Sequence, residues 1–314
     1  MPGVPVTVDN FDRAESHRYF RRYLSLGSLG AFVHIRQPTP IDKQDVIRMN
    51  RDTLYSAMIA DLTSPVTIVK PDPGTRFQSL MPISEDHSIF PAEHAGGEFT
   101  YTQESLGTRY AMFVVRTFAD PGDPQDIAAA NALQNRLEVR QAQAGSFDVP
   151  DWDQESLDKV RGAYLALAAT KTDLSMLFGI KGQMDRLDHM LGTAAGWGGN
   201  TREGAIYTGV TPARNDGTTP YVLTVGDVPV DGFWSVTVYN KDGFMEPNPY
   251  NAYSFNNVTA AKDPDGRVTI HFGGDSGSAN FLPITPGWSY VVRMYRPRRE
   301  LLDGTWSFPE AKAV

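Results

Sequence analysis

The segment of residues 50–53 places four kinds of functional group side by side. Its sequence, Asn-Arg-Asp-Thr, supplies an amide, a fixed cation, a carboxylate and a hydroxyl directly before an apolar, strand-like stretch at residues 54–62. Alternate residues of a strand share a face, so Arg51 and Tyr55 are expected on one side and Asp52 on the other. Two interpretations stay open: a structural Arg–Asp pair or Asx-type turn that holds the strand entry, and a ligand site lined by one of these faces.

A second polar group lies at residues 85–87, Glu-Asp-His, and His94 follows it. Carboxylates beside a histidine can perform general acid–base chemistry or bind a metal. In the catalytic interpretation His87 is the base, and Glu85 or Asp86 orients it. The structural alternative is a polar loop with a satisfied histidine. The spacing between His87 and His94 fits neither a helical pair nor a tight metal-binding turn, so we expect no bound transition metal.

Charged and aromatic residues elsewhere in the chain complete this hypothesis. An arginine near a reacting group can stabilise developing negative charge, which is the role expected of Arg51. The predicted catalytic set is therefore His87, Glu85, Asp86, Arg51 and Asp52. Aromatic rings can line a pocket, and an arginine on a core face needs an acidic partner or serves as a carboxylate anchor. The predicted ligand-binding set is Tyr55, Trp197, Trp234, Arg293 and Tyr295. A sandwich core is the structural alternative for the aromatic residues.

Residues 274–277, Gly-Asp-Ser-Gly, copy the nucleophile motif of chymotrypsin-like proteases. A serine nucleophile also needs a histidine base and an oxyanion hole, and the histidine-containing element that accompanies the motif in those proteases is absent. The chain also lacks a Gly-x-Ser-x-Gly elbow, which argues against an α/β-hydrolase. We therefore expect Ser276 to lie in a turn between two strands and not to act as a nucleophile.

The composition limits the classes of function. The 314 residues carry a formal net charge of −8, so we expect no nucleic-acid partner. Cysteine is absent, which excludes disulfides, thiolate metal sites and a cysteine nucleophile. No apolar run is long enough for a membrane helix, and residues 1–10 lack the features of a signal peptide, so we expect a cytoplasmic protein without a membrane partner. We expect a small-molecule ligand and no cofactor, while homo-oligomer contacts stay an open alternative.

Three regions are expected along the chain. Residues 1–120 begin with a helix near residues 9–26 and continue with short β-type runs, and residues 196–314 return to strands and turns. Residues 121–195 are rich in helix formers. The helical segments expected in this middle region are 128–143, 155–169 and 184–195. The sequence Gly-Trp-Gly-Gly at 196–199 should stop the last of them.

Two groups of motifs resemble known families. Residues 45–62, DVIRMNRDTLYSAMIADL, resemble the signature of domain-of-unknown-function family 1254, and residues 231–240, DGFWSVTVYN, resemble that of family 1214. Motifs that resemble the end of the latter family occur at 280–283, 293–297 and 303–306. The two families usually occur together in one chain. The resemblance implies two jelly-roll-like β units with a helical segment between them. It implies no established activity, although some relatives carry a carboxylesterase label.

We therefore predict a mainly β protein with an α insertion: two jelly-roll-like β-sandwich units, at 1–120 and 196–314, joined by the helical segment 121–195. The first hypothesis for its function is a small-molecule enzyme, a hydrolase of the carboxylesterase kind, with a pocket between the β units that the helical segment caps. The alternative is a non-catalytic module that binds a sugar-like or other small ligand with the same aromatic residues. A third hypothesis is an assembly protein whose helical segment makes the contacts.

Overall fold

The chain divides into two compact units, each built from segments that lie far apart in the sequence. The computed structural model describes residues 3–44, 47–171, 173 and 176–314. The first unit comprises Met1–Arg36, Leu54–Phe118 and Ala128–Arg202. The second comprises Gln37–Thr53, Ala119–Ile127 and Glu203–Val314. These units follow contacts in space, and the division of the sequence at residues 120 and 195 stays a prediction.

The first unit contains two β-sheets that pack face to face. The larger sheet has the spatial order β1 (Val33–His34), β2 (Thr53–Asp61), β6 (Tyr110–Phe118) and β4 (Gln78–Ser84). The smaller sheet has the order β5 (Gly97–Tyr101), β3 (Val66–Lys70) and β7 (Glu138–Gln141). Met58 and Phe113 of the larger sheet pack with Ile68 of the smaller one in a shared apolar core. Alternate residues of β2 and β6 supply this core, as the period of a strand requires.

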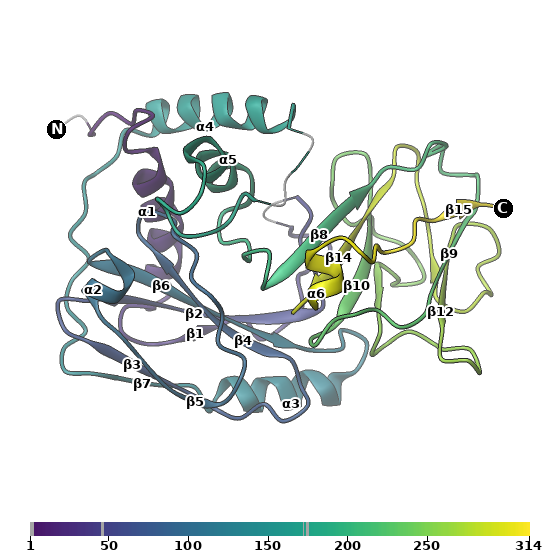
Figure 1. Cartoon of the computed structure of the whole chain (residues 1–314), viewed down its shortest axis with the longest axis horizontal. Helices are drawn as coiled ribbons and strands as arrows, with labels where there is room; N and C mark the ends of the chain where they lie inside the picture. Colours follow the sequence, from purple (N-terminus) through teal and green to yellow (C-terminus); the bar gives the residue numbers. More distant parts are fainter. Residues whose placement is uncertain (1–2, 45–46, 172, 174–175) are drawn as a thin grey trace. The chain divides into compact units, whose positions relative to one another are not determined.

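The other face of the larger sheet is covered by helices, which explains why β4 and β6 are buried on both faces. Helix α1 (Phe11–Leu24) packs on it, and α4 (Gln154–Ala168) and α5 (Arg186–Gly196) pack with α1 (Figure 1). Phe20 of α1 packs with Met81 and Met112 of the sheet. Asp153 caps α4 and Asp185 caps α5, each through its carboxylate and backbone N–H groups of the first turn.

The second unit is a β-sandwich of two four-stranded sheets. One sheet has the order β11 (Ser254–Asn256), β10 (Trp234–Tyr239), β14 (Ser289–Tyr295) and β8 (Ala205–Val210), with antiparallel neighbours. The other has the order β13 (Phe281–Leu282), β12 (Val268–Phe272), β9 (Tyr221–Val225) and β15 (Lys312–Ala313). Trp234, Val236 and Val238 alternate into the core between the sheets, where they meet Ile270 and Trp288. The remaining helices of the described chain are α2 (Gln103–Leu106), α3 (Pro124–Gln134) and α6 (Arg299–Leu302).

The predicted fold class is confirmed: the protein is mainly β, with several antiparallel sheets in sandwich-like units and with helices. The expected single helix at 128–143 is wrong in its second half. The helix α3 ends at Gln134, and Glu138–Gln141 forms β7, which pairs antiparallel with β3. Burial of Leu137 and Val139 against the sheet core favours the strand there. No helix in the described part of the chain is both long and apolar enough to span a membrane.

The sandwich core of the second unit should be sensitive to loss of volume. Ile270 is fully buried, so Ile270→Ala should lower the free energy of unfolding by about 2–5 kcal/mol, because a cavity is left in a close-packed core. Val258 is 61% exposed, so the control Val258→Ala should change it by less than about 0.5 kcal/mol. Urea denaturation measures both. Equal effects of the two substitutions would contradict the assignment of Ile270 to the core.

Candidate functional site

The turn at residues 84–88, directly after β4, is the centre of a buried polar cluster in the first unit. His87 has a left-handed backbone conformation, with φ of 61°, a conformation that few non-glycine residues adopt. The Asp86 carboxylate accepts hydrogen bonds from the Ser84 hydroxyl and from the Ser88 backbone N–H and hydroxyl. These bonds fix the turn and the direction of the Asp86 carbonyl group.

The contacts of His87 are structural and involve both ring nitrogens. The backbone N–H of Gly198 donates to its Nε2 atom at 2.9 Å, so Nε2 carries no proton. Nδ1 therefore donates to the Thr193 hydroxyl at 2.9 Å, and that hydroxyl donates to the carbonyl oxygen of His189. The side chain is fully buried, and burial holds the pKa of His87 well below its usual range. His87 is thus a neutral link between the turn, α5 and the segment after α5.

The other residues predicted in this region contact different partners. Glu85 forms an ion pair with Arg13 at 3.1 Å, and its Oε2 atom lies 3.9 Å from Nε2 of His17. Trp197 stacks on Tyr19, with 4.5 Å between ring centroids. The indole N–H of Trp197 donates to the hydroxyl of Ser16, and its ring lies 5.4 Å from that of His87. Neither Glu85 nor Asp86 has an ion pair or hydrogen bond with the His87 ring among the described residues. Their predicted orienting role stays a prediction.

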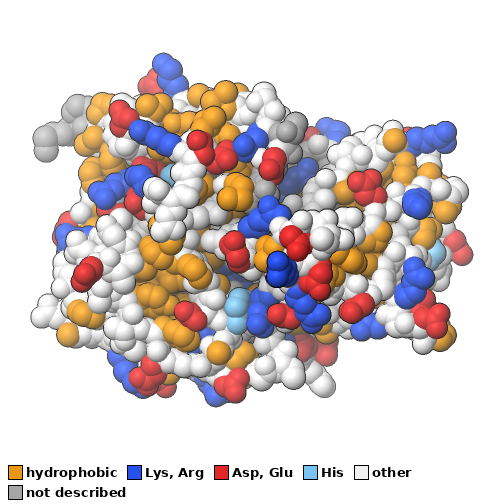
Figure 2. Space-filling model, viewed as in Figure 1, with side chains coloured by type: hydrophobic (Ala, Val, Ile, Leu, Met, Phe, Trp, Pro, Cys, Tyr) orange, Lys and Arg blue, Asp and Glu red, His pale blue; other side chains and the backbone are white. Residues whose placement is uncertain are grey.

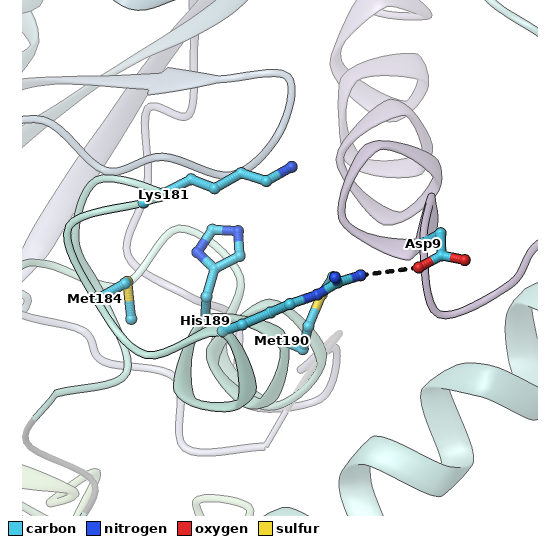
Figure 3. A pocket seen from close by; sticks show the side chains of 7 residues that line it. Asp9, Lys181, Met184, His189 and Met190 are labelled. Atoms are coloured by element: carbon cyan, nitrogen blue, oxygen red, sulfur yellow. Dashed lines mark hydrogen bonds and ion pairs between the residues drawn. The ribbon is translucent and has the colours of Figure 1, made fainter.

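A pocket of about 440 Å³ opens beside this cluster, between the segment before α1, the loop at 181–184 and the start of α5 (Figure 3). It is lined by Asp9, Lys181, Gly182, Met184, Arg186, His189 and Met190. His189 and Met190 are almost fully buried and form its floor. The pocket thus combines two methionine side chains with two cations and a histidine.

Lys181 is held over this pocket by a buried acid. Its Nζ atom lies 2.6 Å from Oδ2 of Asp12 and 3.9 Å from Oδ2 of Asp86. The Asp12 side chain is only 2% exposed. The backbone N–H of Lys181 also donates to the Ser88 hydroxyl at 3.0 Å, which ties the loop to the turn. Because Asp12 is buried, its pairing with Lys181 is costly to break.

His189 is the histidine that lines the pocket, and its side chain is 3% exposed. Its Nε2 atom lies 2.9 Å from the carbonyl oxygen of Asp86, which can only accept, so Nε2 carries the proton. Oδ2 of Asp12 lies 3.9 Å from the same nitrogen. Nδ1 makes no hydrogen bond with any residue that the structure describes, and Figure 3 shows one ring nitrogen on the side of Met184. Burial lowers the pKa of His189, so the ring is neutral near pH 7 and its Nδ1 lone pair is available.

In the second unit, the segment 50–53 forms an Asx-type turn. The Asn50 side-chain oxygen accepts from the backbone N–H groups of Asp52 and Thr53. Arg51 donates to the carbonyl oxygen of Thr39, and its guanidinium lies 5.3 Å from the ring centroid of Tyr253. Local bonds thus hold this segment, and its use as a ligand site stays a prediction. Residues 45–46 of the signature lie outside the described residues.

Asp52 and Arg293 belong to one buried network of the second unit. Asp52 is fully buried, and burial raises its pKa, while a hydrogen bond from Asn256 and the charge of Arg293 act in the opposite direction. Arg293 donates to the hydroxyls of Thr237 and Tyr239 and to the carbonyl oxygen of Arg48. Although burial lowers it, the pKa of Arg293 is held above its usual range, mainly by Tyr239 and Tyr295. The network fastens the loop before β2 to strands β10 and β14.

Three other predicted ligand-binding residues have packing roles in their units. Trp234 is 3% exposed and lies in the sandwich core. Tyr295 is 2% exposed and stacks on Phe233, with 4.3 Å between ring centroids. Tyr55 of the first unit lies beneath the guanidinium of Arg116, at 5.6 Å. Ser276 lies in an exposed turn between β12 and β13, as expected.

The residues that line the pocket were not predicted from the sequence. One signal was available for Asp12: with Ser16 and Phe20 it forms an i, i+4, i+8 series on one face of α1, and polar residues on the face that carries Phe20 are expected to be buried. No comparable signal marks Lys181 or His189, because their role depends on the turn at 84–88, which is distant in the sequence.

Family profiles match two parts of the chain. Residues 29–98 match the family described as "Protein of unknown function (DUF1254)", and residues 207–299 match "Protein of unknown function (DUF1214)". The chain is a DUF1254–DUF1214 protein. This confirms the resemblance seen in the motifs. The DUF1254 match includes the turn at 84–88, and the DUF1214 match lies within the second unit. No curated protein matches the chain.

Two crystal structures are similar to this DUF1254–DUF1214 protein over almost its whole length. The VPA0106 protein from Vibrio parahaemolyticus has a TM-score of 0.73 and is 20% identical, over 98% of this chain and 97% of that one. A putative uncharacterized protein from Burkholderia cenocepacia has a TM-score of 0.54 and is 14% identical, over 96% of this chain and 87% of that one. At these identities the likeness shows a shared fold.

Removal of the buried cation in the DUF1214 region should destabilise the protein. Arg293→Met removes the positive charge that acts most strongly on the buried Asp52 carboxylate, so the free energy of unfolding should fall by about 3–5 kcal/mol. The double variant Arg293→Met/Asp52→Asn should lose less than the sum of the two single variants, by about 1–3 kcal/mol. Denaturant unfolding of all four proteins measures this coupling. Strictly additive losses would contradict an electrostatic link between the two residues.

Stability should fall as the solution becomes acidic, because three neutral histidines have a lowered pKa in the folded state. Burial lowers the pKa of His34 to about 4, and it also lowers those of His87 and His189. Below about pH 6.5 the unfolded chain binds protons that the folded chain does not, so the free energy of unfolding decreases towards pH 5. Each such histidine contributes up to about 1.4 kcal/mol per pH unit.

His87→Asn isolates one of these contributions. Asparagine tolerates the left-handed backbone at this position, so the fold should survive with lower stability. The slope of the unfolding free energy against pH, measured between pH 5 and 6.5, should become shallower than in the wild type. His271→Asn in β12 is the control. A slope that stays unchanged in the His87 variant would mean that His87 is not a buried neutral residue.

Proposed function

We propose that the pocket of the first unit is the active site of a small-molecule enzyme, and that the reaction is hydrolysis of an ester. The observation that carries this proposal is the neutral His189 ring, whose proton is held by the Asp86 carbonyl at 2.9 Å and whose other nitrogen is left for a ligand. A histidine with a pKa below neutrality and a fixed tautomer is suited to general base catalysis at pH 7. Hydrolysis of this kind needs no cofactor.

The roles of the pocket residues follow from their positions. Nδ1 of His189 takes a proton from a water molecule while the water oxygen forms a bond to the ester carbonyl carbon. The carbonyl oxygen gains negative charge, which the Lys181 ammonium group stabilises. When the C–O bond to the alcohol breaks, the His189 imidazolium returns the proton to the leaving oxygen. Asp12 and Asp86 act as positioning residues, because they hold Lys181 and the Nε2 proton of His189.

Binding without catalysis is the second candidate function, and one observation favours it. Lys181 already has a close ionic partner in Asp12, at 2.6 Å, which reduces the charge that it offers to a carbonyl oxygen. In that case the methionine side chains bind an apolar body and the polar groups only fix its orientation.

The experiment that separates these functions uses p-nitrophenyl esters of acetic, butyric and hexanoic acid with the full chain. His189→Asn should lower kcat/KM by roughly 10²-fold or more, because the base is removed. Its melting temperature should remain close to that of the wild type. The control His271→Asn replaces a histidine of the second unit and should keep full activity. In the wild type, activity should be constant near pH 7 and fall only on the acidic side of about pH 6.5, as His189 becomes protonated.

Two results would contradict the enzyme hypothesis. One is hydrolysis in the wild type no faster than in buffer for all three esters. The other is an equal rate in His189→Asn and the wild type. Binding of the intact ester to the pocket without turnover supports the second candidate function.

A further inference from the structure

The two cations of the pocket are paired in different ways. Lys181 is paired with Asp12, whose side chain is 2% exposed. Arg186 is paired with Asp9, and the exposed fractions of these two side chains are 69% for Arg186 and 80% for Asp9. An ion pair between two exposed side chains contributes only about 0–1 kcal/mol and is screened by salt. A pair with a buried carboxylate is far more costly to separate. Of the two cations, Arg186 is therefore the one that a ligand can recruit.

The guanidinium of Arg186 also has unused donors. Its Nη2 atom donates to Oδ1 of Asp9 at 3.0 Å and to the Val8 carbonyl oxygen at 3.4 Å. Nε and Nη1 make no hydrogen bond with residues in the described part of the chain. Figure 3 draws the bond that ends at Asp9 as a dashed line. Each edge that can bind a carboxylate with two parallel bonds includes Nη2, so release of Asp9 would free such an edge, together with Nε or Nη1, for a ligand.

The floor of the pocket fits an apolar body next to that anchor. Met190 is 3% exposed, and Met184 lines the same pocket. Methionine side chains are flexible and polarisable, so they adapt to chains of varied shape. On the face that Figure 2 shows, acidic and basic side chains are interspersed.

We propose that the pocket selects small monocarboxylates with an apolar chain, and that Arg186 binds the carboxylate by exchanging Asp9 for it. The inference rests on the proposed function, for which it names the substrate class: an ester that carries a free carboxylate at the end remote from His189 and Lys181. Asp9 then acts as a competitor for Arg186 and lowers the affinity for the ligand.

The test is binding of hexanoate, with 1-hexanol as the uncharged control, followed by NMR of methyl-labelled methionine in the full chain. Hexanoate should shift the resonances of Met184 and Met190, and hexanol should bind more weakly. Asp9→Asn should tighten hexanoate binding by roughly two- to fivefold, because it removes the competing carboxylate. Arg186→Gln should weaken it roughly tenfold or more. Arg140→Gln, which removes another exposed ion pair, with Glu98, should change nothing.

Three results would overturn the inference: no binding of hexanoate to the wild type, equal binding of hexanol, or unchanged affinity in Arg186→Gln. The esterase assay distinguishes this failure from failure of the proposed function. If His189→Asn loses ester hydrolysis while Arg186→Gln binds hexanoate as well as the wild type, the enzyme hypothesis stands and the role of Arg186 as carboxylate anchor is rejected. If hexanoate binding depends on Arg186 but the wild type hydrolyses no ester, the carboxylate anchor stands and the enzyme hypothesis is rejected.

Discussion

The candidate site depends on one uncharged histidine, His87, and on the two hydrogen bonds of its ring. The ring accepts from the Gly198 backbone and donates to Thr193 of α5, so it joins the turn after β4 to the helix that carries His189. The Asp86 carbonyl in the same turn then fixes the proton of His189. Protonation of His87 would place a second donor against the Gly198 N–H group and would break this arrangement. The tautomer of the proposed base is therefore set by a buried neighbour that itself touches no ligand.

The polar groups of the two units serve different purposes. In the second unit, Arg293 and Tyr239 donate to the carbonyl oxygens of Arg48 and Met49, and the Asx turn at Asn50 completes the loop. These bonds hold the loop that contains the signature motif. In the first unit, the ionic groups around the turn at 84–88 lie beside a pocket of about 440 Å³. Both units contain buried ionic and aromatic residues. The first unit is the better candidate because its polar groups lie beside this pocket.

Part of this organisation follows from local sequence. Trp234 and its alternate neighbours predict a strand with an apolar face, and β10 has that pattern because the period of a strand is fixed. The Asx turn follows from Asn50, and the end of α5 follows from the glycines after it. Local sequence does not predict the structure of segment 128–143, because its alanines favour a helix throughout. Its second half forms a strand because it pairs with β3, about seventy residues earlier in the sequence, and so buries Leu137 and Val139.

The site itself could be predicted only in outline. Glu85, Asp86 and His87 lie in the turn beside the pocket, and a run of polar residues after an apolar strand must be hydrogen-bonded if it is buried. Contacts between the turn, α1 and α5 determine which histidine faces the pocket. These contacts produce no periodic pattern in the sequence. Lys181 has the same difficulty: its importance comes from Asp12, which lies at the other end of the first unit's sequence.

The most direct test of this account is the protonation state of His189, measured by ¹⁵N NMR of labelled histidine at pH 7. The account predicts a neutral ring with the proton on Nε2 and a lone pair on Nδ1, and a shift of the Nδ1 resonance when hexanoate is added. A ring that is protonated on both nitrogens at pH 7, or a proton on Nδ1 alone, would contradict the assignment of His189 as the base.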